Sequence, residues 1–282
     1  MDAPTAPPEK ITAMPAPGVP TIRSVNWGGL RTLYVKEVRR FFKVHLQTIW
    51  APAITTLLFL VVFTVATGAK RPVLIGNVSV PFGDFIAPGL IISQGMMGPA
   101  FANSSFSLLV GKIQGTIVDY LMPPLSTMEL LTALVGGAMT RAFIVGFIVW
   151  VAMALYGLGV WPQHLWAVVW FGFLGAMFLS LLGVLTSVWA EKFDHAAAVS
   201  NFVIIPLGLL SGTFYSVTNL APTFRVISHF NPFFYIISGF RYGFLGGADS
   251  PIVVGSIAIF GLDLGLALIC YWLLDKGWKI KS

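Results

Sequence analysis

Few side chains in this sequence could carry out chemistry, and none of them forms a known catalytic pattern. Residues 191–195 place two carboxylates and one imidazole within five positions, and all three are possible metal ligands. A metal site needs further His or Cys ligands, and because none accompanies this segment we interpret it as a charged turn. Gly111-Lys112 is followed by Ile113 and lacks the earlier glycine of a phosphate-binding loop, and the sequence contains neither H-E-x-x-H nor G-x-S-x-G. We therefore predict that the chain is not an enzyme, binds no metal and holds no cofactor itself.

Two charged residues stand within or beside long apolar runs. Asp263 lies near the middle of residues 251–274, and Arg141 directly precedes residues 142–163. An ionisable group at membrane depth is costly, so it usually marks a functional site or a structural pair. For Asp263 we favour a structural pair over a proton relay, because no other acid or histidine lies deep inside a run. Arg141 is buried at some depth if its helix begins near Leu130; the alternative, which we favour, is that its side chain reaches back to the membrane surface.

Residues 26–45 have the pattern of a basic amphipathic helix. Apolar side chains such as Leu33 recur at spacings of three and four, whereas the basic residues, including Arg39 and Arg40, fall largely on other faces. Next to a membrane span, such a helix is expected to lie in the plane of the interface; a solvated helix or a plain basic flank is the alternative. Its single acid, Glu37, has the spacing to pair with Arg40, which we favour over a basic group on a neighbouring subunit.

Two broken stretches interrupt the apolar runs. Residues 112–129 form a polar loop between the second and third runs, and Pro123-Pro124 ends whatever helix precedes it. Residues 216–247 are too polar for an ordinary span, yet part of this stretch is dense in aromatic residues. We interpret it as short helices that re-enter the outer membrane face, joined by turns at Asn231-Pro232 and at residues 246–247. An aromatic interfacial loop is the alternative.

Composition sets the class of protein. Apolar residues make up 56% of the chain and charged residues 10%, and the mean hydropathy is +0.84, whereas about a quarter of the residues in soluble domains are charged. A helix needs about 20 apolar residues to cross a bilayer. The apolar runs are residues 46–67, 85–111, 142–163, 165–190, 196–214 and 251–274. We therefore predict an all-α integral membrane protein with six transmembrane helices, and the lone Cys270 excludes a disulfide framework.

The charge distribution predicts the orientation. Residues 1–20 hold six prolines and no apolar signal-peptide region, so we expect residues 1–25 to be a disordered tail. With both termini cytoplasmic, 13 Lys and Arg residues lie inside and four outside, which accounts for all 17. Cytoplasmic flanks of membrane proteins carry such an excess, so both termini are expected inside and the basic balance does not require nucleic acid.

The segment NPFFYIISGFRYGFLG resembles the signature near the C-terminal end of type-2 ABC exporter permeases, and the chain looks closest to the branch of the drug and nodulation-factor exporters. The segment includes Asn231, Pro232, Gly239, Phe240 and Arg241. The resemblance runs from about Arg31 to Lys281. It implies that residues 26–282 form one six-span permease domain in a bacterial inner membrane.

The resemblance also implies partners and a substrate class. A separate ATPase chain would bind ATP and Mg²⁺, two copies of this chain would form a dimer, and a hydrophobic or amphipathic compound would be exported between them. The loop of residues 112–129 would dock on the ATPase through a short coupling helix, and the N-terminal helix would pack nearby. The residues implied in docking are Lys112, Asp119, Tyr120, Leu121, Pro123 and Pro124. We expect the second and fifth runs to line the path, because Gly, Pro and small polar residues interrupt them.

Two other classes of function remain as alternatives. An ATP-independent secondary transporter or channel would show inverted repeats and several embedded polar groups, and the two halves show no convincing similarity. An intramembrane enzyme would need paired acids, a Ser or a His/metal constellation inside the runs, and none is present.

Overall fold

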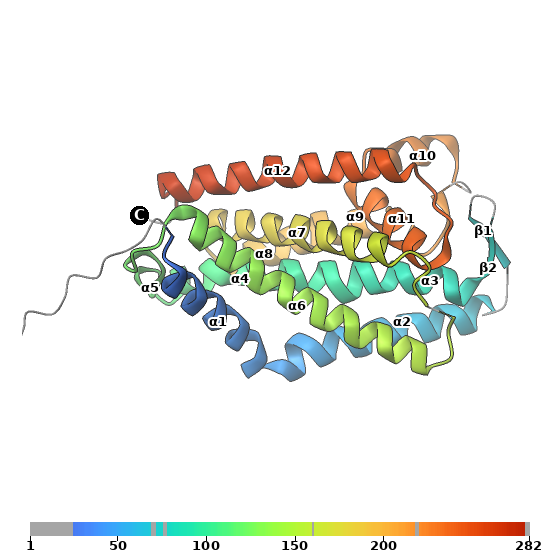
Figure 1. The fold of residues 1–282 in the computed structure, drawn as a ribbon, viewed down its shortest axis with the longest axis horizontal. Helices are drawn as coiled ribbons and strands as arrows, with labels where there is room; N and C mark the ends of the chain where they lie inside the picture. Colours follow the sequence, from blue (N-terminus) through green and yellow to red (C-terminus); the bar gives the residue numbers. More distant parts are fainter. Residues whose placement is uncertain (1–24, 69–71, 76–77, 160, 218–219, 280–282) are drawn as a thin grey trace, which may run out of the picture.

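The computed structural model describes residues 25–68, 72–75, 78–159, 161–217 and 220–279, which form a mostly helical molecule with one two-stranded sheet (Figure 1). The predicted tail, apart from Val25, lies outside the described residues. The elements, with π-helical turns written η, are α1 (Trp27–Lys43), η1 (Leu46–Trp50), α2 (Ala51–Thr67), β1 (Pro72–Ile75), β2 (Val78–Pro81), α3 (Phe82–Leu90), η2 (Ile91–Met97), α4 (Gly98–Ile113), α5 (Val118–Leu121), α6 (Thr127–Leu155), α7 (Leu165–Trp189), α8 (Phe193–Val199), η3 (Ser200–Ile204), α9 (Ile205–Leu209), α10 (Pro222–His229), α11 (Pro232–Leu245) and α12 (Ile252–Lys276).

Within the described residues, five helices are long and apolar enough to cross a membrane. They are Leu46–Ala66, Phe82–Ile113, Thr127–Leu155, Leu165–Trp189 and Ile252–Lys276. The predicted fifth run instead forms a shorter apolar helix, Phe193–Leu209. At about 1.5 Å per residue this helix is about 26 Å long, slightly less than the ~30 Å hydrocarbon core of a bilayer. It ends early because the chain turns after Leu209, where Gly212 adopts a left-handed φ of 80°.

The three π-helical turns in the described part of the chain share a sequence cause. η1, η2 and η3 each run directly into an α-helix that has a proline in its first turn, and these prolines are Pro52, Pro99 and Pro206. Proline has no backbone N–H, and its ring crowds the carbonyl one turn earlier. The wider π turn accommodates the proline without ending the helix.

The spans pack around α7, which contacts α4, α6, α11 and α12. Small residues let these helices approach closely. A Cβ at Gly183 of α7 would collide with the Ser104 hydroxyl of α4, and one at Gly239 of α11 would overlap the ring of Phe171 in α7. Of the 18 consecutive residues that are most apolar, 78% are buried in the second candidate span, whereas only 17% are buried in the corresponding stretch of α12. The second span is therefore central, whereas α12 presents most of its surface outward.

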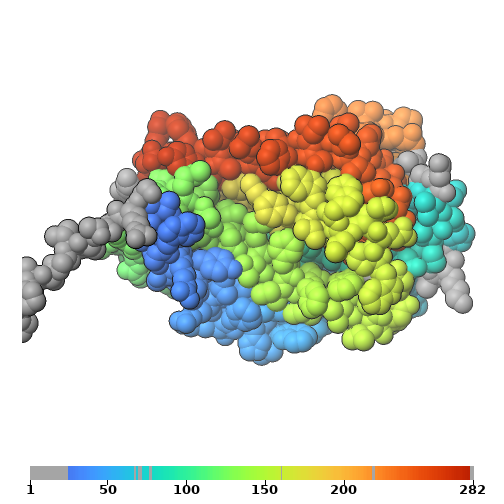
Figure 2. Space-filling view, in the orientation of Figure 1, coloured from blue at the N-terminus to red at the C-terminus, as the bar shows by residue number. Residues whose placement is uncertain are grey.

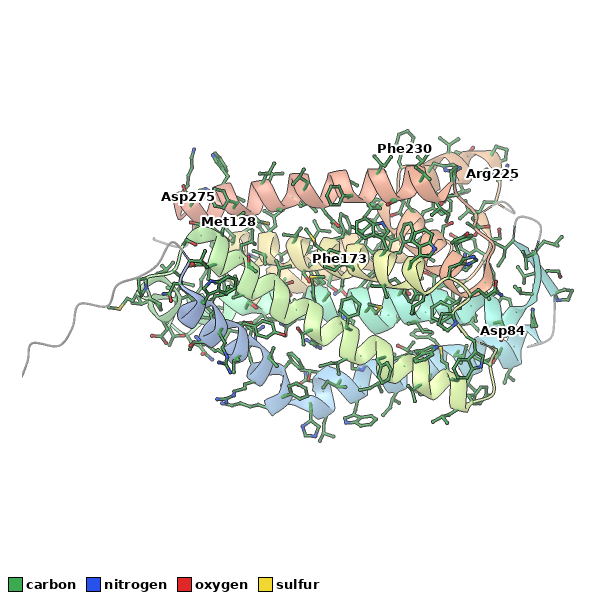
Figure 3. The ribbon with its side chains drawn as sticks, in the orientation of Figure 1. Asp84, Met128, Phe173, Arg225, Phe230 and Asp275 are labelled. Atoms are coloured by element: carbon green, nitrogen blue, oxygen red, sulfur yellow. The ribbon has the colours of Figure 1, made fainter. Side chains whose placement is uncertain are left out.

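The molecule has two distinct ends. One end, called here the α5 end, holds α1, α5 and the last turn of α12, and Met128 and Asp275 lie there (Figures 1 and 3). The opposite end, called the hairpin end, holds the antiparallel β1–β2 pair, α10 and α11, with Asp84, Arg225 and Phe230 (Figures 1 and 3). The long helices connect the two ends.

Candidate functional site

A capping arrangement fixes where α1 starts on the α5 end. Asn26 caps α1 by accepting a hydrogen bond from Gly29 N, at 2.9 Å. The backbone N–H of Asn26 donates to the carboxylate of Glu129, which also closes a capping box with Ser126 at the start of α6. The first turns of α1 and α6 are thus joined, so the buried face of α1 lies against the spans in one register.

Glu37 on this buried face is the centre of a polar cluster. The side chain is fully buried, and its Oε2 lies 2.9 Å from Arg40 Nη2 and accepts a hydrogen bond from Ser107 Oγ at 2.8 Å. Its Oε1 accepts a hydrogen bond from the hydroxyl of Tyr120 at 3.2 Å. A Cβ at Gly137 of α6 would lie 2.7 Å from Glu37 Cβ, so only glycine permits this approach. The cluster therefore joins α1, α4, α5 and α6.

Arg40 extends the cluster along the second span. Its pair with Glu37 has the i, i+3 spacing anticipated from the sequence. Nη2 also donates to the carbonyl of Asn103 at 2.7 Å and to Ser107 Oγ at 2.8 Å. Among the described residues, Arg40 Nη1 and Asn103 Nδ2 are buried without a hydrogen-bond partner. The negative charge of the Glu37 carboxylate is thus balanced by Arg40 and by two hydroxyl donors. The two groups of the cluster that lack a hydrogen-bond partner among the described residues are both N–H donors.

Tyr120 links the cluster to the loop that contains α5. It is buried, and the ammonium of Lys36 lies 3.8 Å from the centre of its ring. Burial, with the negative charge of Glu37 as a smaller contribution, raises the pKa of the Tyr120 phenol. The hydroxyl therefore stays protonated at neutral pH and donates to Glu37.

The other residues implied in docking divide into two groups. Asp119, Leu121, Pro123 and Pro124 are exposed at the surface of the loop. Lys112 points inward instead, and its ammonium donates to the carbonyls at positions 188 and 190, at 2.6 and 2.9 Å, where it satisfies the C-terminal end of α7. The exposed residues of the first group are available to a partner, whereas Lys112 is not. Met122, which lies among them in the sequence, is 80% exposed and is available as well.

The signature residues form a second cluster at the hairpin end. Arg241 is fully buried, pairs with Asp249 at 3.0 Å, and donates to the carbonyl of Gly212 at 2.8 Å. Its guanidinium lies 4.0 Å from the centre of the Phe85 ring, which is a cation–π contact between α11 and α3. Asp249 also accepts a hydrogen bond from Ser216 Oγ at 2.7 Å. The cluster ties α11 to the segments that flank it on both sides in sequence.

Asn231 and Pro232 start α11. The Asn231 side chain accepts from Phe233 N at 3.0 Å and donates to the carbonyl of Leu207 in α9 at 2.7 Å. Pro232 occupies the first turn of α11, where its missing N–H costs nothing. Phe240 is buried in the main core. Asn231 and Pro232 thus position the start of α11, and Phe240 lines a cavity of about 300 Å³ together with residues of α6 and α7.

The two embedded charges are both buried. Arg141 is 7% exposed, and its Nε donates to the carbonyl of Thr48 in η1 at 3.1 Å. Because α6 begins at Thr127, Arg141 lies about four turns into the helix, and the extension of its side chain toward the membrane surface stays a prediction. Asp263 is 0% exposed, and neither carboxylate oxygen has a hydrogen-bond partner among the described residues. The structural pair expected for Asp263 is therefore not found in this part of the chain.

Sequence reasoning did not single out Ser107 or Gly137 as members of the site. The available signal was the group of small polar residues in the second apolar run, which includes Asn103. Such residues need hydrogen-bond partners inside a membrane protein, but the sequence does not say that the partner is α1, more than 60 positions earlier. The Leu33 side chain was anticipated on the apolar face of α1 and is buried with Leu130 of α6.

Comparison with known proteins identifies the family. The model of the family described as ABC-2 type transporter matches residues 29–245. The chain is 35% identical to the inner membrane transport permease YadH of Escherichia coli (strain K12) over 258 residues, which cover 91% of this chain and 98% of that protein. It is also 27% identical over 238 residues to nodulation protein J of Rhizobium leguminosarum bv. viciae, covering 83% of this chain and 90% of the relative. The family predicted from the signature segment is thus confirmed, and this chain belongs to the ABC-2 type transporter family as a multi-span membrane protein of its permease branch.

Proposed function

We propose that this chain is the membrane subunit of an ATP-driven exporter of a hydrophobic or amphipathic substrate, and that a separate ATPase chain binds ATP and Mg²⁺ and docks on the loop that contains α5. The observation that carries this proposal is the hydrogen bond between Tyr120 and Glu37. It connects an exposed loop to α1, which leads into the first span.

The loop is suited to docking because its two faces differ. Tyr120 faces inward, whereas Val118, Leu121 and Met122 are 48%, 38% and 80% exposed. Apolar side chains on a polar loop outside the spans favour a protein partner, since exposed apolar patches on soluble surfaces usually mark interfaces. Asp119, also exposed, adds a charge that could fix the orientation of the partner.

The cluster supports transmission of movement from the loop to the spans. A displacement of α5 pulls on Glu37 of α1 through Tyr120, and Glu37 in turn holds Ser107 of α4. Because α1 leads into the first span through η1, and α4 is the end of the second span, both spans receive the movement. Elements with two packed arrangements are the physical basis of such coupling.

The membrane arrangement that we infer has six crossings, with Phe193–Leu209 as the fifth and both termini in the cytoplasm. In this arrangement α1 lies in the interface plane on the α5 side, and α10 and α11 re-enter the membrane from the hairpin side. Twelve of the 17 Lys and Arg residues lie in flanking segments assigned to the α5 side and four in segments assigned to the hairpin side, with Arg141 inside α6, and this excess supports the orientation. The α11 helix is buried among other helices, which is where non-spanning backbone is tolerated at membrane depth.

A cavity of about 230 Å³ between the second span and the η3–α9 segment supports the substrate class. Its lining includes Ser93, Gln94, Phe101, Ser200, Ile204 and Phe214. Hydroxyl and amide groups beside aromatic and aliphatic side chains suit an amphipathic compound. We infer that a second copy of this chain faces this side and completes the path, since the η3–α9 segment, which forms one wall of the cavity, has no buried residue within one chain.

The experiment that tests this function is purification of the tagged chain from its native membrane in mild detergent, followed by identification of the bound proteins. We expect a stoichiometric subunit with a phosphate-binding loop. A Met122→Asp variant should insert normally and lose this subunit, whereas Phe230→Asp, which changes an equally exposed side chain at the hairpin end, should keep it. A chain that purifies alone with an intact fold would overturn the proposal.

One observation favours the alternative of an ATP-independent secondary transporter. Asp263 is buried in the last span without a hydrogen-bond partner among the described residues, and embedded acids of this kind occur in ion-coupled transporters. If the chain purifies alone, loss of transport in an Asp263→Asn variant would support this alternative. Unchanged transport in that variant would argue against it.

A further inference from the structure

The exposed face of α1 is strongly basic and carries no compensating acid. Arg31, Lys36, Arg39 and Lys43 are all exposed, and none of them belongs to an ion pair with another described residue. Glu37, the only acid of α1, lies on the opposite, buried face. The positive charge of this face is therefore available to an anionic partner.

The charged face lies beside the start of the first span. α1 ends at Lys43, and η1 begins at Leu46. Figure 1 shows α1 turning directly into α2, and Figure 2 shows α1 on the surface of the molecule next to the start of that span. A span of Leu46–Ala66 would enter the hydrocarbon near Leu46, which places the last turns of α1, with Arg39 and Lys43, at the depth of the lipid headgroups.

Apolar side chains surround the basic ones at this depth. Phe42, Leu46 and Trp50 are 45%, 71% and 48% exposed. Basic groups with flanking aromatic and aliphatic side chains are typical of a helix at the boundary between headgroups and acyl chains. A soluble subunit would have to displace lipid to cover them, so the chemistry of this face favours lipid over protein.

We propose that Arg39 and Lys43 bind the phosphate groups of anionic phospholipids in the leaflet on the α5 side, with Arg31 and Lys36 adding attraction farther from the span. Guanidinium and ammonium groups are ordinary phosphate ligands. Each Lys or Arg near an anionic surface contributes attraction equal to about a fivefold change in affinity. The proposal does not depend on the ATPase partner or on the direction of transport.

The test is native mass spectrometry of the purified full-length chain released from nanodiscs that contain phosphatidylcholine and phosphatidylglycerol. We expect phosphatidylglycerol to be enriched on the wild-type protein relative to the disc, and the enrichment to fall as ionic strength rises. In Arg39→Gln/Lys43→Gln the preference should fall about fivefold per side chain removed. The matched control is Lys10→Gln/Arg23→Gln, which removes one lysine and one arginine from the sequence that precedes α1 and should keep the preference.

Further variants separate folding from binding. Arg39→Lys/Lys43→Arg retains both charges and should retain the enrichment, and the thermal melting of every variant should match that of the wild type, because both positions are exposed. Equal enrichment in Arg39→Gln/Lys43→Gln and the wild type would overturn the proposal. Loss of a bound protein subunit without any change in lipid enrichment would assign this face to a protein partner instead, and would also overturn it.

Discussion

The hydrogen bond between Tyr120 and Glu37 should couple the loop energetically to the spans, and a double-mutant cycle can measure that coupling. Tyr120→Phe removes the hydroxyl and keeps the ring against the core. Glu37→Gln keeps the size of the side chain and one acceptor oxygen but removes the charge that Arg40, Ser107 and Tyr120 share. The double variant removes both the Tyr120 donor and the charge of its acceptor.

The magnitudes follow from the geometry. A hydrogen bond to a charged group contributes about 1.5–3 kcal/mol, and the 3.2 Å distance from the Tyr120 hydroxyl is long for O–H···O, so we expect Tyr120→Phe to cost about 1.5 kcal/mol. Glu37→Gln weakens contacts to three donors, but Arg40 is 29% exposed and regains water, so we expect a cost of about 2 kcal/mol. Because Glu37→Gln removes the charge that strengthens the hydrogen bond lost in Tyr120→Phe, the two single variants share part of one interaction, and the double variant should cost about 1 kcal/mol less than their sum.

The assay is unfolding of the purified chain by a denaturing detergent in mixed micelles, followed by circular dichroism. The control is Tyr215→Phe, which removes a hydroxyl that donates to the carbonyl of Leu209 at the hairpin end, and which should be additive with Glu37→Gln. Additivity of Tyr120→Phe and Glu37→Gln within about 0.3 kcal/mol would refute the reasoning. ATPase activity of the assembled transporter, measured on the same variants, would then show whether the stability coupling accompanies functional coupling.

Three further predictions concern the ionisation of Tyr120 and the two buried acids Asp249 and Asp263. Because burial raises the pKa of Tyr120 above its ordinary value of about 10, the unfolded chain loses this proton first as pH rises. Stability should therefore fall above about pH 10 in the wild type and less in Tyr120→Phe, and identical alkaline profiles would contradict this. Asp249→Asn leaves the Arg241 guanidinium buried without its counter-charge, so the unfolding free energy should fall by about 3 kcal/mol or more, whereas Asp84→Asn at the same end should change it by less than about 1 kcal/mol. Asp263→Leu replaces a buried carboxyl group that has no hydrogen-bond partner among the described residues, so the unfolding free energy should rise by about 1–3 kcal/mol; a loss of similar size would indicate a partner contributed by another chain.

Hydropathy alone predicts most of the long helices but misplaces some of their ends. α6 begins at Thr127, well before the apolar run at residue 142, because Arg141 interrupts the run without interrupting the helix. The start of α6 is marked in the sequence by Ser126 and Glu129, which form a capping box, but a hydropathy profile does not register capping residues. The fifth run failed the length criterion because the turn at Gly212 depends on contacts with α11.

The site could be predicted only in part, for a physical reason. The i, i+3 pair of Glu37 and Arg40 is local, so spacing was enough to anticipate it. The contacts of Glu37 with Ser107 and Tyr120 join positions 70 and 83 residues apart, and only the fold brings them together. Spacing likewise could not distinguish Lys112, which points inward, from Asp119, which is exposed.

The π-helical turns divide the helices into jointed and stiff ones. α6, α7 and α12 run for 29, 25 and 25 residues and contain no proline. The first span, the second span and the Phe193–Leu209 segment each contain a π turn followed by proline, where fewer backbone hydrogen bonds resist bending. The three proline-free helices therefore resist bending along their whole length, whereas each of the other helices has one turn at which it bends more easily. The cavity between the second span and the η3–α9 segment is bounded by two of these turns, so a change in its width would bend two helices where their backbone hydrogen bonding is weakest.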